Sequence, residues 1–146
     1  MSFDISKNLL KGVSTITLSE NREMNISTGN LDITSVKLNG LPLEPQIKEG
    51  IFRIKGNGTL EISFESKFAG VNGNENLENA GVVSNDIISD EGISLTGVWY
   101  PNIENRAYYH LKALLPEGFS LRGGRDCCQE YTAGYGIYFQ LSSSSE

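Results

Sequence analysis

The sequence predicts a mostly β protein, built as an antiparallel β-sandwich or a saddle-shaped open sheet. Apolar and polar residues alternate over many short segments, and Gly accounts for 16 of the 146 residues. No window keeps the apolar recurrence of an amphipathic helix for more than about two turns. Many short strands separated by turn residues are typical of sandwiches and open sheets rather than of parallel α/β folds.

The N-terminal third is expected to hold a strand pair followed by shorter strands. Residues 3–5 and 9–18 alternate with period two, which places Leu10, Ser14, Ile16 and Leu18 on one face. The polar stretch 19–23 is expected to end the pair. Asn39-Gly40 is a turn signal. The shorter strands are expected at residues 24–27, 31–33 and 36–38.

A β-hairpin is expected in the middle of the chain. Residues 51–55 and 60–64 both alternate between apolar and polar side chains. Between them, Gly56-Asn57-Gly58 supplies residues that tolerate a positive φ. The pattern therefore predicts a reversal of the chain at these three residues.

The second half is expected to contain a long excursion and then three further strands. Residues 69–90 are rich in Gly, Asn, Asp and Glu, and excursions of this length are often functional or mobile. Strands are expected after it, at residues 93–95, 98–100 and 108–115. Residues 121–146, with Gly123-Gly124 and several tyrosines, are not assigned a fold.

Charge and hydropathy exclude several partners. The formal net charge is -6 and the pI is about 4.8, so nucleic acid is an unfavourable partner. We expect no transmembrane segment, because no apolar run approaches the roughly 20 residues that a spanning helix needs. Met1 to Ile5 carry no secretory signal. The compartment is left open: cytoplasmic for the chain as given, exported if a signal peptide precedes it.

The few nucleophiles and metal ligands argue against catalysis by this chain. The two cysteines, Cys127 and Cys128, are adjacent, and His110 is the single histidine. These residues cannot supply the three or four ligands of a zinc site or the two histidines of a metallopeptidase helix. We interpret His110 as a half-exposed strand residue. Glu75 and Glu78 form a conceivable glycosidase pair, but a solvated acidic loop is the favoured interpretation.

The aromatic segment Trp99-Tyr100-Pro101 is the candidate ligand or substrate-cleft contact. Together with Tyr108 it could stack on a sugar or a peptide, because aromatic faces offer a large contact area. Packing in the core or at an edge is the competing interpretation. No catalytic residue, metal ligand or cofactor is assigned to this chain.

Several segments, in order, carry a resemblance to a known family. They are Phe3-Asp4-Ile5-Ser6, Leu10-Lys11-Gly12-Val13-Ser14-Thr15-Ile16-Thr17-Leu18, Val36-Lys37-Leu38-Asn39-Gly40, Leu95-Thr96-Gly97-Val98-Trp99-Tyr100-Pro101, Tyr109-His110-Leu111 and Leu115-Pro116-Glu117-Gly118-Phe119. In this order they resemble the N-terminal β domain of M1-family, aminopeptidase-N-like zinc metallopeptidases, in its bacterial M1-like form.

The resemblance implies a domain that does not catalyse by itself. In the family the saddle-shaped β domain packs on a catalytic domain, which carries the zinc, and walls one side of the peptide-substrate cleft. Residues 1–119 would be this domain, with an M1-like catalytic domain as the partner. Asn102-Ile103-Glu104-Asn105 replaces the family's acidic-Pro motif, which leaves recognition of the peptide end in doubt. The alternative is a free-standing carbohydrate- or peptide-binding β-sandwich.

The resemblance stops near Phe119. Bacterial relatives continue with a Ser-Glu-Ala-Glu-like stretch, and codons for Leu121-Arg122-Gly123-Gly124 can encode that stretch when read one base later. We therefore hypothesise that residues 120–146 form an irregular tail that is out of frame or disordered.

Overall fold

The computed structural model describes most of the N-terminal two-thirds of the chain and separate segments beyond it. The described residues are 1–68, 87–90, 92–95, 98–103, 107–110, 114, 119–121, 130–133 and 139–143, some of them by their backbone alone. The strands are β1 (Ser2–Asp4), β2 (Leu9–Ser27), β3 (Asp32–Leu38), β4 (Leu41–Leu43), β5 (Ile51–Lys67), β6 (Ile87–Ile88), β7 (Gly92–Leu95), β8 (Asn102–Ile103), β9 (Ala107–His110), β10 (Phe119–Leu121), β11 (Glu130–Ala133) and β12 (Phe139–Ser143).

The described residues contain one short 3-10 turn, η1 (Ile5–Lys7), and no α-helix. None of their helical segments has the length and apolar character needed to cross a membrane. The predicted mostly β, antiparallel class is confirmed, and it takes the form of a curled open sheet rather than a closed barrel.

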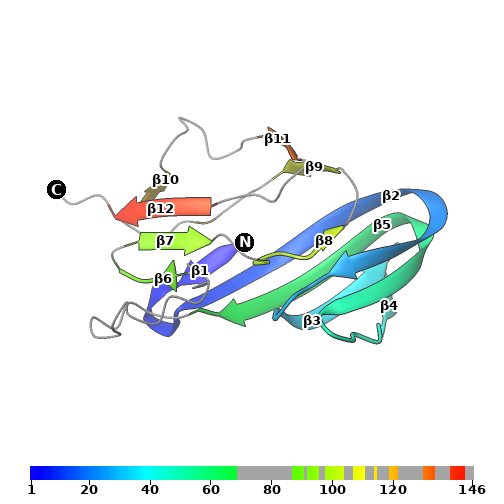
Figure 1. Ribbon diagram of the computed structural model, residues 1–146, viewed down its shortest axis with the longest axis horizontal. Coiled ribbons are helices and arrows are strands. Elements are labelled where there is room, and N and C mark those ends of the chain that lie inside the picture. The colour runs from blue at the N-terminus through cyan, green and yellow to red at the C-terminus, as the bar shows by residue number, and fades with distance from the viewer. Residues whose placement is uncertain are drawn as a thin grey trace.

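Two long strands form the backbone of this sheet. Strands β2 and β5 pair antiparallel along almost their whole length, within the order β1-β2-β5-β3-β4, and β8 also pairs with β2. Figure 1 shows the two strands running side by side and curling together at one end. The sheet therefore folds back over itself as a half-barrel.

The bend lies at matching positions of the two strands. The register of β2 on β5 shifts between Leu18 and Arg22, and the residues paired with these two are Gly58 and Gly56. A bulge of this kind sharpens the local twist and bends the strand. The predicted hairpin at 51–64 is therefore wrong, because Gly56-Asn57-Gly58 bends one continuous strand instead of reversing the chain. The predicted strand boundary at 19–23 is wrong for the same reason.

The turn between β3 and β4 is fastened to this bend. Asn39 and Gly40 have φ values of 53° and 81°, which confirms the predicted turn. The Asn39 side chain accepts a 2.8 Å hydrogen bond from the backbone N–H of Thr59 and donates one of 3.0 Å to the carbonyl of Asn57. The bend is thus held from the neighbouring strand.

Curling gives the sheet an interior of its own. The buried residues of this first core come from both halves of the long strands and from β3, and they are Leu18, Ile26, Val36, Phe52, Ile54, Leu60 and Ile62. Inward and outward residues alternate along β5, as a half-buried strand requires. The face predicted for the first half of β2 is confirmed by Leu10 and Leu18, which are both buried.

A second core lies at the other end of the long strands. Its buried residues are Leu10, Leu31, Phe64, Ile88, Ile93, Leu95 and Trp99. They join the curled sheet to a second sheet of order β10-β12-β7-β6 (Figure 1). The side chain of Asn8 adds a hydrogen bond to the carbonyl of Ile88 across this junction.

The predicted strands of the second half are only partly found. Residues 93–95 lie in β7, but residues 98–100 form no strand. Of the predicted strand 108–115, residues 108–110 lie in β9 and Leu114 makes an isolated parallel bridge to Ser2. Residues 69–86 lie outside the described residues.

The predicted division of the chain at residue 119 remains a prediction. Two strands beyond it are described by their backbone. Strand β11 pairs with β9, and β12 pairs with both β7 and β10.

Gly58 should be the residue of the bend that tolerates substitution least. Its φ is +106°, and a Cβ there would overlap the Asn39 side chain. We expect Gly58→Ala to destabilise the fold by about 1 to 3 kcal/mol more than Gly40→Ala, since Gly40 shares the positive φ but has open space around it. Denaturant unfolding of both variants measures the difference. Equal losses would contradict this explanation of the bend.

Candidate functional site

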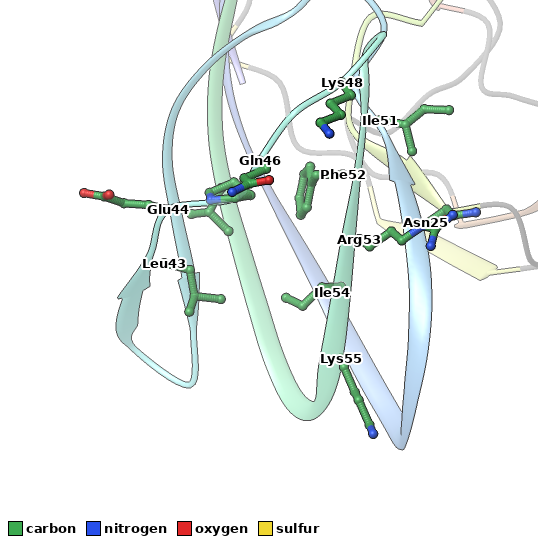
Figure 2. A pocket seen from close by; sticks show the side chains of 12 residues that line it. Asn25, Leu43, Glu44, Gln46, Lys48, Ile51, Phe52, Arg53, Ile54 and Lys55 are labelled. Atoms are coloured by element: carbon green, nitrogen blue, oxygen red, sulfur yellow. The ribbon is translucent and has the colours of Figure 1, made fainter.

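An open groove lies where the curled sheet fails to close. It has a volume of about 830 Å³ and lies between β4 with the segment after it and the first part of β5. Figure 2 shows Leu43 and Glu44 on one side of this groove and Phe52 and Ile54, from the first part of β5, on the other. The lining residues are Asn25, Val36, Leu43, Glu44, Pro45, Gln46, Lys48, Ile51, Phe52, Arg53, Ile54 and Lys55.

The floor of the groove is apolar. Val36, Phe52 and Ile54 belong to the first core and are at most 7% exposed. Figure 2 shows Phe52 and Ile54 on the groove side of β5, whereas Arg53 points to the other side. This alternation follows from the period of two along a strand. A bound segment would therefore meet apolar side chains inside and charged ones outside.

One wall of the groove is a strand edge. On its first side β5 pairs with β2 from Ile51 to Gly56. On its second side it pairs with β3 only from Leu60 onward, and Lys48 bridges to Ile51 at the top of the groove. Between these two contacts, the described strands provide no ladder partner for the second edge of β5.

The opposite wall is a strand edge of a different kind. Strand β4 pairs with β3 through Val36–Leu43 and Leu38–Leu41. Pro42 lies between the two β4 residues of these pairs, and a proline has no N–H to donate to a further strand. The edge of β4 that faces the groove is therefore poorly suited to strand pairing.

Cations predominate at the β5 side of the groove. Arg53 forms an exposed ion pair of 3.4 Å with Glu23, and Lys55 lies two residues further along the same face. Ion pairs this exposed contribute little to stability. Lys48 and Glu44 are the other charged lining residues. The local balance is positive on a chain whose net charge is -6.

Exposed apolar side chains are concentrated in the chain segment 41–51, from which Leu43 and Ile51 line the groove. Seven large hydrophobic residues are exposed among the described side chains, and four of them fall between positions 41 and 51. These four are Leu41, Leu43, Ile47 and Ile51, with Leu41 70% exposed. Clusters of exposed apolar residues commonly mark interaction sites. We call these four residues the apolar rim.

The predicted contact residues do not line the groove: Trp99 belongs to the second core and Tyr100 packs against it. Trp99 is fully buried, Pro101 is also buried, and Tyr100 is partly buried. The Trp99 and Tyr100 rings meet edge to face, with centroids 4.7 Å apart. Trp99 is therefore packed inside the protein in this arrangement. The ligand or substrate-cleft contact expected of Trp99, Tyr100 and Pro101 stays a prediction.

Most of the other candidates from the sequence lie outside the part of the chain that the structure describes. Glu75, Glu78, Cys127 and Cys128 lie outside the described residues, and His110 is described by its backbone in β9. The described residues contain no cluster of three or more His, Cys, Asp or Glu able to hold a metal. The groove lining has one carboxylate and no Ser, Cys or His. This lining can bind a ligand but offers no nucleophile paired with a base.

Comparison with known proteins adds no family. No protein-family model matches this chain, and no curated protein matches it.

The strongest titration shift in the described residues lies outside the groove, at the N-terminal turn. The Lys7 ammonium and the Ser6 hydroxyl donate hydrogen bonds of 2.8 and 2.7 Å to Asp4. They lower the pKa of Asp4 from 3.8 to about 2, and the carboxylate in turn raises the pKa of Lys7. The contribution of this ion pair to stability is therefore present above pH 3.8 and is lost as the pH falls toward 2. It is lost again at strongly alkaline pH, where Lys7 gives up its proton.

We expect NMR titration to place the Asp4 midpoint near 2. Lys7→Met should move it toward 3.8, because the main hydrogen-bond donor is removed. Lys11→Met is the control, since Lys11 pairs with Glu65 instead. An unchanged midpoint in Lys7→Met would show that Lys7 is not the cause.

Trp99→Ala should destabilise the fold by about 3 to 5 kcal/mol, because it leaves a large cavity in the second core. Val98→Ala, at a neighbour that is 43% exposed, should change stability by no more than about 0.5 kcal/mol. Thermal or denaturant unfolding measures both. A Trp99→Ala variant as stable as the parent would contradict the burial of this ring.

Proposed function

We propose that this chain acts as the non-catalytic N-terminal β domain of an M1-like metallopeptidase, packing on a catalytic domain and shaping its substrate cleft. The ordered sequence segments that resemble that family suggest the proposal. The curled open sheet is compatible with the family's saddle-shaped domain. In this role the chain hydrolyses nothing alone, and zinc belongs to the catalytic domain.

The observation that carries the proposal is the apolar rim. Leu41, Leu43, Ile47 and Ile51 are exposed within one short segment, and two of them line the groove, whereas most other large hydrophobic residues with described side chains lie in or against the two cores. Leaving such a group in water is unfavourable by roughly 25 cal/mol for each Å² of apolar surface. A neighbouring domain that covers the rim would remove this cost. The rim therefore supports a packing role better than an isolated one.

The lining of the groove agrees with a supporting role. It offers apolar contacts and cations but no pair of groups that could activate water. Trp99, one of the aromatic residues on which a free-standing carbohydrate-binding module would depend, is buried in the second core. Binding to a protein surface is thus the better-supported activity.

The test is reconstitution with a separately expressed catalytic domain of a bacterial M1-like metallopeptidase. We expect the two chains to co-elute in size-exclusion chromatography and the mixture to cleave an aminoacyl-nitroanilide that this chain alone does not cleave. Bound zinc together with peptide cleavage in this chain alone would overturn the proposal.

Charged substitutions should locate the docking face. Leu41→Asp together with Ile47→Asp should weaken association at least about tenfold, because a charge would be placed within the covered apolar rim. Val13→Asp is the matched control, at a residue 58% exposed on β2 and outside the rim. Calorimetric titration measures the affinities. Loss of association in Val13→Asp alone would place the interface elsewhere.

A further inference from the structure

We propose that the groove binds an extended peptide segment as an added strand on the free edge of β5, and that the segment alternates apolar and acidic side chains. This inference rests on the proposed function, because it names the kind of element through which a partner domain docks. It follows from the hydrogen-bonding edge, the blocked opposite wall and the side chains on the two faces of β5.

The first step is the orientation of the backbone groups. The N–H and C=O of Ile51 bond to the C=O and N–H of Lys48, each at 2.9 Å, on the edge of β5 that faces the groove. In an antiparallel ladder, alternate residues direct both groups to the same edge. Arg53 and Lys55 therefore present their N–H and C=O groups to the groove.

The second step is that no strand among the described residues pairs with these groups. The register of β3 on β5 ends at Leu60, and the segment after β4 pairs only at Lys48. Phe52 and Ile54 use the opposite edge, toward β2. Arg53 and Lys55 thus form a short open template for a partner strand.

The third step concerns which wall a segment would pair with. Pro42 removes a donor from the β4 edge, and Pro45 follows in the adjoining segment. A segment in the groove therefore finds hydrogen-bond partners on β5 and apolar surface, such as Leu43, on the β4 side. Strand addition to an exposed edge commonly combines main-chain bonds with pockets for alternate side chains.

The fourth step is the pattern of the bound segment. Side chains of an added strand would lie beside those of β5 on each face. The groove face offers Phe52 and Ile54, which favour apolar residues, and the other face offers Arg53 and Lys55, which favour Asp or Glu. Glu23 competes for Arg53 only through an exposed 3.4 Å pair. The predicted pattern is therefore apolar-acidic-apolar-acidic.

Fluorescence anisotropy with two labelled, end-capped peptides tests the inference. The probes are Val-Glu-Val-Glu-Val-Glu and Val-Lys-Val-Lys-Val-Lys. We expect the glutamate peptide to bind at least about tenfold tighter, and its advantage to shrink as salt is added. In hydrogen exchange, the amides of Arg53 and Lys55 should become protected by the glutamate peptide.

Two variants and a control locate the binding. Lys55→Glu should reverse or abolish the preference for the glutamate peptide. Lys55→Pro should weaken both peptides, because it removes an N–H that faces the groove while leaving the bonds to β2 in place. Lys67→Glu, at the far end of β5, should leave binding unchanged. If Lys55→Pro fails to fold, Lys55→Glu and the exchange pattern still decide.

The outcomes separate this inference from the proposed function. No peptide binding, or binding without protection of Arg53 and Lys55, overturns strand addition even if the catalytic domain still associates. Self-association of the chain through this groove, seen by light scattering and relieved by Lys55→Pro, would assign the edge to a second copy and also overturn it. Peptide binding with no association to the catalytic domain would instead overturn the proposed function.

Discussion

The structure depends on one constraint: the two long paired strands, β2 and β5, must bend at positions that lie opposite each other. Strands β2 and β5 are long enough to extend far beyond one core, and only a shared bend lets both halves cover apolar side chains. The register shift between Leu18 and Arg22 on β2 lies opposite Gly56 and Gly58 on β5. Bulges and glycines are a common means of curving a sheet. Asn39 then holds the bend from the next strand.

The same bend creates the groove. Before the bend, from Ile51 to Gly56, β5 pairs with β2 at one edge. Strand β3, which carries β4 on its other edge, pairs only with the part of β5 after the bend. A small closed barrel would fill its interior and leave no strand edge. Here the curl stops before β4 meets β5, so part of the first core lines an opening that includes Phe52 and Ile54. The core and the candidate site are therefore made of the same residues.

The sequence predicts that the protein is mostly β, and it predicts which side chains share one face of a strand, because the period of two is a local signal. It shows Leu10 and Leu18 on one face and the turn at Asn39-Gly40, and the structure confirms both. It does not distinguish a reversal from a bend at Gly56-Asn57-Gly58, since both use the same permissive residues. The difference is decided by pairing with β2, which is distant in sequence. The groove could not be predicted for the same reason.

The contrast between the two walls of the groove argues that the open edge of β5 is retained for binding. Unpaired strand edges favour aggregation, and proteins commonly block them with prolines or charges. Pro42 provides such a block on β4. The edge of β5 has no proline from Ile51 to Lys67, and it lies beside the apolar rim rather than away from it. Its cations, Arg53 and Lys55, limit pairing with like-charged or neutral strands but not with an acidic one. An edge protected against most strands and open to one kind is what a selective strand-binding site requires.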